Sequence, residues 1–218
     1  MSRDYGRIAF TDDVRAAQAE YGSSGFYDGM PRRTDSPESS DPLGPKEAEF
    51  LTERDGFYLA TVSETGWPYV QFRGGPPGFL HVLDEHTIAW ADFRGNLQHV
   101  SSGNLLGDQR VAMIAMDYPR RQRLKLFGTA RVIRTQDDPT FVSSLEVEGE
   151  YAVVEAAYVV TVTAFDWNCP QHIPQRFTLA QVEQRIAPLR DRIRELEDRL
   201  SASTTSHETA VQTLDPTD

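Results

Sequence analysis

Short β-rich runs separated by tight turns fill residues 57–133, and this alternation constrains the fold more than any other feature of the chain. Turn-forming residues separate the runs, as at residues 74–77 (Gly-Gly-Pro-Pro) and 84–86 (Asp-Glu-His). Short strands at this spacing indicate an antiparallel meander that closes into a barrel. The runs that we expect to be strands cover residues 57–62, 67–73, 78–83, 87–91, 110–116, 121–133 and, as a strand buried on both faces, 156–165.

The rest of the chain is predicted to flank this barrel. We expect an α+β fold that is mostly β, with flanking helices and a long C-terminal helix. In residues 1–45, a short helix capped by Thr11 precedes an arm that either wraps a partner subunit or is disordered, because residues 22–45 offer little apolar surface to bury. Pro45 suits the first position of a second helix, and the main domain follows over residues 46–177. Residues 201–218 are rich in Ser and Thr, and we expect them to be a disordered tail.

A heptad pattern predicts a C-terminal helix over residues 178–200. Its apolar residues are spaced alternately three and four apart, and Pro188 is expected to kink or interrupt the helix. Such a narrow stripe favours pairing with one other helix, in the same chain or in a partner, over packing onto the barrel. The residues of the stripe are Leu179, Val182, Ile186, Leu189, Ile193, Leu196 and Leu200.

Composition excludes several classes of function. A formal net charge of −11 argues against a general nucleic-acid binder. The chain has no apolar run of about 20 residues that would cross a bilayer, and its N-terminus lacks the apolar core of a signal peptide, so we expect a cytoplasmic protein. A single cysteine, Cys169, excludes an internal disulfide framework, and with His172 it makes only a weak metal pair. The other histidines show no ligand spacing, and no hydrolase motif is present, so no metal site and no hydrolase are predicted.

An anion site is predicted between residues 88 and 128. Gly95 and Asn96 are interpreted as a turn that opens a helix over residues 95–106, and free amides at a helix start attract phosphate. The following strand carries Arg121, Arg123 and Lys125 at alternate positions, hence on one face. The alternatives are that Asn96 is simply a helix cap and that the basic residues form a solvated face.

The order of these elements resembles a known family. The elements are, in order, a helix, a β-meander, the Gly-Asn turn, the basic strand Arg-Gln-Arg-Leu-Lys-Leu-Phe-Gly-Thr-Ala at residues 121–130 and a late strand ending in Trp167. This order is similar to that of the pyridoxamine 5′-phosphate oxidase-like, FMN-binding split β-barrels. The resemblance covers roughly Glu47 to Phe177, and residues 165–177 resemble a signature of an uncharacterised branch of the family. It implies a homodimer with one FMN at each of two subunit interfaces.

The resemblance also implies where the cofactor is held. The strand at residues 69–73 would run beside the flavin ring, residues 90–92 would form its floor, and residues 94–96 would hold its phosphate. That loop lacks the lysine of the family motif, so Arg123 or Lys125 would replace it, while Trp167 and Arg176 would approach from the other subunit. The implied cofactor-binding residues are Tyr69, Val70, Gln71, Arg73, Ala91, Asp92, Arg94, Gly95, Asn96, Gln122, Arg123, Lys125, Trp167 and Arg176, and no catalytic acid or base is named.

From the resemblance we expect an FMN-dependent oxidoreductase that acts on a small molecule or on NAD(P)H. Strict pyridoxamine phosphate oxidation is not expected, because Phe177 and Thr178 follow Arg176 where that enzyme has an Arg-Leu-His-Asp-Arg pattern. The alternatives are a flavin-binding protein without turnover and a split barrel that uses the deazaflavin F420 or haem.

Overall fold

The computed structural model describes residues 3–27, 29, 40–147, 153–168 and 170–212. Part of the predicted arm (residues 28 and 30–39), Cys169 and the last residues of the predicted tail lie outside this part of the chain. Residues 1–174 and residues 175–218 form two compact units, which are described separately.

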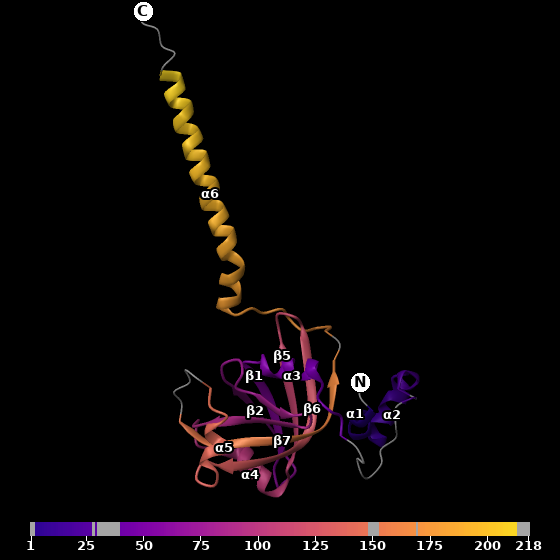
Figure 1. Cartoon of the computed structure of the whole chain (residues 1–218). Coiled ribbons are helices and arrows are strands. Elements are labelled where there is room, and N and C mark those ends of the chain that lie inside the picture. The colour runs from indigo at the N-terminus through magenta and orange to yellow at the C-terminus, as the bar shows by residue number, and fades with distance from the viewer. Residues whose placement is uncertain (1–2, 28, 30–39, 148–152, 169, 213–218) are drawn as a thin grey trace, which may run out of the picture. The chain divides into compact units, whose positions relative to one another are not determined.

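Seven antiparallel strands form one sheet in the order β2-β1-β5-β6-β7-β4-β3 (Figure 1). Within the described residues no backbone ladder joins β2 to β3 or to β4. The curled sheet is therefore a barrel with one open seam, which confirms the predicted split barrel. The strands are β1 (Gly56–Val62), β2 (Pro68–Gly74), β3 (His81–Asp84), β4 (Thr87–Phe93), β5 (Arg110–Asp117), β6 (Gln122–Arg134) and β7 (Val154–Trp167).

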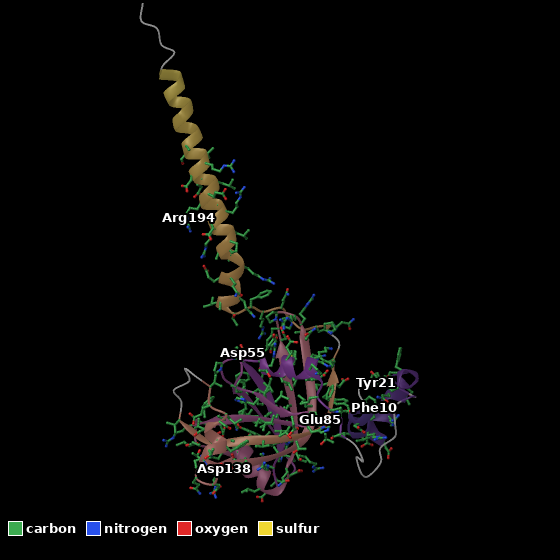
Figure 2. All side chains as sticks on the ribbon, in the orientation of Figure 1. Phe10, Tyr21, Asp55, Glu85, Asp138 and Arg194 are labelled. Atoms are coloured by element: carbon green, nitrogen blue, oxygen red, sulfur yellow. The ribbon has the colours of Figure 1, made fainter. Side chains whose placement is uncertain are left out.

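Helices flank the sheet, and local capping explains where several of them begin. Thr11 caps α2, and the Asp138 carboxylate accepts a hydrogen bond from Phe141 N (3.0 Å) at the start of α5 (Figure 2). The Glu47 carboxylate accepts a hydrogen bond from Gly44 N (3.1 Å), and Pro45 opens α3 as predicted. The helices are α1 (Arg3–Ala9), α2 (Asp12–Glu20), α3 (Pro45–Thr52), α4 (Val100–Gly107), α5 (Pro139–Ser143) and α6 (Leu179–Gln212), with a 3-10 turn η1 at Ser24–Phe26.

Helix α1 was not predicted. It packs on β7, and the Tyr5 ring stacks on Phe127 of β6 with ring centroids 5.0 Å apart. Among the described residues, no helix combines the length and the apolarity needed to cross a bilayer.

Two predicted helix boundaries were wrong. Helix α4 begins at Val100 rather than at Gly95, because Leu97 and His99 adopt left-handed backbone angles (φ 61° and 48°) that a right-handed helix cannot contain. Helix α6 continues to Gln212, although residues 201–218 were expected to be disordered. No Gly or Pro occurs between Leu189 and Gln212, so the sequence offers no strong stop signal there.

The core has an inner and an outer layer. Inside the barrel, the Trp90 ring stacks on Tyr158 (centroids 5.2 Å apart) and meets Phe57 edge to face (4.9 Å). On the outer face, Ala89 and Ala157 are fully buried in a separate apolar cluster with residues of α5. Strands β4 and β7 are thus buried on both faces over most of their paired region, as was predicted for residues 156–165 of β7.

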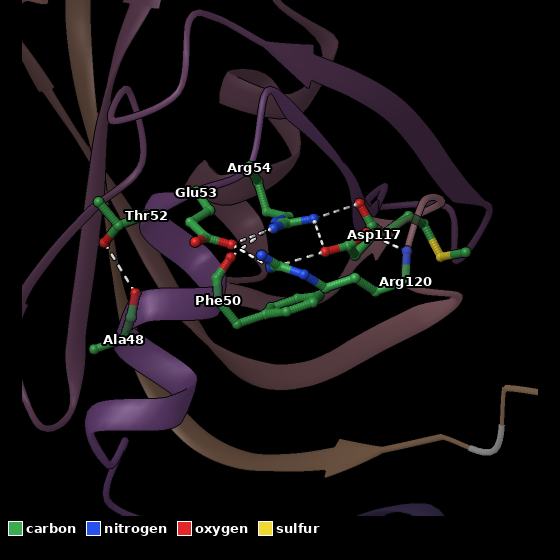
Figure 3. A network of polar contacts seen from close by, with 8 residues as sticks. Ala48, Phe50, Thr52, Glu53, Arg54, Asp117 and Arg120 are labelled. Atoms are coloured by element: carbon green, nitrogen blue, oxygen red, sulfur yellow. Dashed lines mark hydrogen bonds and ion pairs between the residues drawn. The ribbon is translucent and has the colours of Figure 1, made fainter. Parts of the chain in front are cut away.

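A buried ion-pair network fixes helix α3 to the β5–β6 hairpin (Figure 3). Arg54 Nη1 lies 3.1 Å from the buried Asp117 carboxylate, and Arg54 Nε donates to Phe50 O (2.8 Å). Asp117 also accepts a hydrogen bond from Arg120 N (2.8 Å), and Arg120 Nη1 donates to Glu53 Oε2 (2.6 Å). Every charge in this group therefore has a partner.

We predict that Asp117→Ala lowers the free energy of unfolding by about 3–5 kcal/mol, because the buried Arg54 would keep only its ion pair with the partly exposed Glu53. The control is Asp137→Ala, which removes an exposed ion pair with Arg134 and should cost less than about 1 kcal/mol. Urea denaturation measures both values. Equal losses in the two variants would contradict the role assigned to the buried network.

Candidate functional site

A cleft lies at the open seam of the barrel, between edge strand β2 and strand β4. The empty volume of the cleft is about 380 Å³, which includes solvent space at its open side. The loop after β4, the start of α4 and Glu155 of β7 complete its wall. Its lining residues are Tyr69, Gln71, Arg73, Asp92, Phe93, Gly95, Asn96, Leu97, Gln98, His99, Val100, Ser102 and Glu155.

A side-chain network bridges the seam where backbone pairing is missing. Arg73 of β2 forms an ion pair with Asp92 of β4, and Arg73 Nη2 donates to the Tyr158 hydroxyl of β7 (3.3 Å). The Arg73 guanidinium also lies over the Tyr158 ring, 5.0 Å from its centroid. Three strands, one of which is not hydrogen-bonded to the other two, are thus held together by side chains.

Burial shapes the ionisation of this network. It raises the pKa of Asp92 above its ordinary value, against the opposing effect of Arg73. Burial also raises the pKa of Tyr158, so its hydroxyl remains protonated at neutral pH and can donate a hydrogen bond. The Nε of Arg73 is buried without a hydrogen-bond partner among the described residues. The base of the cleft therefore offers donors at fixed positions.

The loop between β4 and α4 is held in an unusual conformation. Both Leu97 and His99 have positive φ angles, which a residue with a side chain adopts at a cost of about 1–3 kcal/mol. The Asn96 side chain accepts a hydrogen bond from Gln98 N (3.1 Å) and stabilises the turn. Such strain is common at functional sites, and here it lies in the wall of the cleft.

Helix α4 presents its N-terminus at the cleft. His99 occupies the cap position but makes no side-chain capping bond, so the first-turn amides have no cap from that side chain. Ser101 Oγ donates to Gln71 Oε1 (3.0 Å), and Ser102 Oγ lies 2.7 Å from the Tyr158 hydroxyl. These contacts fix the helix start against β2 and β7. Uncapped amides at a fixed helix start suit a phosphate or another anion.

Many of the residues implied by the resemblance meet in this cleft. The residues that line it are Tyr69, Gln71, Arg73, Asp92, Gly95 and Asn96. Arg94 is next to them, more than half exposed, with its Nε 3.4 Å from Glu155 Oε1. Two do not line it: Val70 is on the opposite face of β2, and Ala91 is buried in the outer apolar cluster.

Another group of the implied residues lies elsewhere in the unit. Gln122, Arg123 and Lys125 are at the start of β6, where Lys125 lies 3.4 Å from Asp166 and 4.7 Å from the Tyr5 ring. Trp167 donates from Nε1 to Glu47 (2.6 Å) and meets Phe50 edge to face. It is nine residues from Tyr158 along β7, or about 30 Å of strand at 3.3 Å per residue. Arg176 belongs to the second unit, so the structure does not relate it to the cleft.

Several residues in or beside the cleft were not predicted from the sequence. Tyr158 is in an apolar strand and was counted as core, although a buried tyrosine hydroxyl generally requires a hydrogen-bond partner. His99 was judged only as a metal ligand, and Ser101 and Ser102 carry no recognisable motif. Among the described residues, no group of three or more His, Cys, Asp or Glu side chains is placed to hold a metal ion.

Comparisons with solved structures find similar folds at low identity. HupZ from Group A Streptococcus is 14% identical, over 62% of this chain and 100% of that chain, with a TM-score of 0.47. An FMN-binding protein from Syntrophomonas wolfei is 10% identical, over 72% of this chain and 96% of that chain, with a TM-score of 0.41. HutZ, the haem storage protein from Vibrio cholerae, is 15% identical, over 56% of this chain and 90% of that chain, with a TM-score of 0.35. A comparison with curated proteins finds no match.

The family model described as pyridoxamine 5′-phosphate oxidase matches residues 43–161, more than half of the chain. The matched span contains every residue that lines the cleft, as well as Tyr158. Trp167 and Arg176 lie beyond it. The chain belongs to the pyridoxamine 5′-phosphate oxidase family.

Proposed function

We propose that the chain binds FMN in the seam cleft and acts as an FMN-dependent oxidoreductase on a small molecule or on NAD(P)H. One observation carries the proposal: an uncapped helix start, Arg94 and the Arg73 network border one recess inside the family-matched span. FMN supplies the redox chemistry, and the protein supplies binding, orientation and electrostatics.

The phosphate end of FMN fits the start of α4. The first-turn amides of α4 would donate to the phosphate oxygens, and the exposed Arg94 would add a charge-assisted hydrogen bond. Arg94 would have to exchange its contact with Glu155 for the phosphate. This arrangement offers a cation from the loop itself, although the loop lacks the lysine of the family motif.

The polar edge of the flavin fits the other end of the cleft. Gln71 accepts from Ser101 through Oε1, and its amide nitrogen can donate to a flavin carbonyl. Arg73, which lines the cleft and is held in place by the Tyr158 hydroxyl, supplies a further donor. Tyr69 and Leu97 contribute apolar surface to the cleft wall. These residues would bind and orient the ring.

A second copy of the chain is proposed to cover the ring. Alternate residues of β2 face opposite ways, so Val70 and Phe72 point away from the cleft and are 60% and 56% exposed. With Tyr58 of β1, whose ring lies 5.4 Å from that of Phe72, they form an apolar patch next to the cleft. An exposed patch of this kind suits a subunit interface. Contacts of Arg123, Lys125 and Trp167 with the flavin would be made only across this interface, with each subunit's residues reaching the cleft of the other.

We predict that Arg94→Ala weakens FMN binding about 10- to 150-fold, the equivalent of about 1.5–3 kcal/mol for a hydrogen bond to a charged group. Riboflavin, which lacks the phosphate, should bind the variant and the parent protein equally well. Flavin fluorescence titration measures both affinities, with Arg110→Ala as the exposed-arginine control. Equal loss of FMN and riboflavin binding would contradict the placement of the phosphate.

The proposed interface predicts an effect of Val70→Asp on the cofactor. The side chain of Val70 faces away from the cleft, so a new charge there should weaken FMN binding at least about tenfold only if a partner covers that face. Leu83→Asp, on the exposed side of β3, is the matched control and should bind FMN normally. Unchanged FMN affinity in Val70→Asp would argue against the shared site.

Turnover separates the enzyme from a binding protein. Purified protein should be yellow with FMN-like absorbance and should consume NAD(P)H steadily when an electron acceptor is present. FMN binding without turnover on NAD(P)H or on small-molecule donors would support a flavin-binding protein instead. A Soret band would indicate haem, and tighter binding of F420 than of FMN would indicate a deazaflavin protein.

A further inference from the structure

The second unit carries an apolar stripe, most of whose residues are exposed within that unit. Side chains project from α6 around Arg194 (Figure 2), and the stripe includes Leu189 (63% exposed) and Ile193 (55% exposed). We call this stripe the seam of α6. It contains Leu179, Val182, Ile186, Leu189, Ile193, Leu196 and Leu200.

The residue types of the seam favour a two-stranded coiled coil. In heptad lettering, Ile186 and Ile193 occupy a positions, and Leu189 and Leu196 occupy d positions. β-Branched residues at a with leucine at d favour parallel dimers over higher oligomers. The next d and a positions, Ser203 and His207, are polar in sequence, so the seam ends at Leu200. Its 22 residues span about 33 Å at 1.5 Å per residue.

Charges beside the seam select the direction of pairing. The g positions between Leu179 and Leu200 are all arginine: Arg185, Arg192 and Arg199. An antiparallel pair brings g positions opposite g positions, so arginine would meet arginine at each such contact. In a parallel pair, g positions meet e positions of the next heptad, and Arg192 would meet Glu197 of the other helix. The parallel arrangement has one repulsive contact, between Arg185 of one helix and Arg190 of the other.

Pro188 is compatible with this seam. It occupies a c position, away from the a and d residues, and α6 continues through it. Because proline has no N–H, the helix lacks one backbone hydrogen bond, the one to the carbonyl of Gln184. Gln184 is at an f position, on the outer side of the helix. The proline therefore removes no seam contact.

We propose that α6 pairs in parallel and in register with α6 of a second copy of this chain. The same face is self-complementary in its apolar residues and in the Arg192–Glu197 contact, so an identical helix satisfies it. Both helices then start at the same end of the coiled coil, which brings two flavin-binding units of different chains to that end. The seam is short, and pairing of the barrels would strengthen it through a higher effective concentration.

Disulfide trapping tests the pairing directly. In full-length protein carrying Cys169→Ser, Leu196→Cys places one thiol at a d position of each helix. In a parallel, in-register pair these thiols are adjacent across the seam, so mild oxidation should cross-link most chains into dimers on a non-reducing gel. Asp191→Cys, at an outer f position, is the matched control and should cross-link little. Equal cross-linking of the two variants, or none in either, would overturn the proposal.

A charge reversal tests the direction separately. Arg190→Glu replaces the repulsion between Arg185 and Arg190 in a parallel pair with attraction. In the Leu196→Cys protein it should raise the ratio of disulfide to thiol several-fold in a glutathione redox buffer. In an antiparallel pair the two thiols introduced at position 196 would lie apart, so the same change would not raise that ratio. Neither measurement involves flavin, so failure here leaves the proposed cofactor site untouched.

Discussion

The ion pair between Arg73 and Asp92 joins two strands that the backbone leaves apart. The sheet order puts β2 and β4 on opposite sides of the open seam, so side chains must hold that part of the barrel together. Tyr158 connects the pair to β7 and, through Ser102, to the start of α4. One buried network therefore stabilises the open seam of the barrel and positions the donors of the cleft. A change at Arg73 should affect both the stability of the barrel and the cleft.

Strand β2 connects the cleft to the proposed subunit interface. Its alternation sends Gln71 and Arg73 into the cleft and Val70 and Phe72 to an exposed apolar face. A ligand in the cleft and a partner on that face would then contact opposite sides of the same strand.

The sequence was sufficient for the architecture because alternation of short strands and turns is a local signal. It located the seven strands and α3. It could not show that the Arg94–His99 loop bends through left-handed conformations, because Leu97 and His99 have no intrinsic preference for them. It also missed Tyr158, whose role depends on contacts with Arg73 and Ser102, 85 and 56 residues away. Residues that meet across the seam are distant in sequence, and no periodicity links them.

A crystal structure of the protein grown with FMN tests the central claim most directly. The account predicts the phosphate at the first-turn amides of α4 beside Arg94 and the polar edge of the ring at Gln71 and Arg73. It also predicts a second copy that packs against Val70 and Phe72 and contributes residues to the open side of the cleft. FMN bound away from the seam cleft, or an FMN complex in which a single copy encloses the whole flavin, would contradict it.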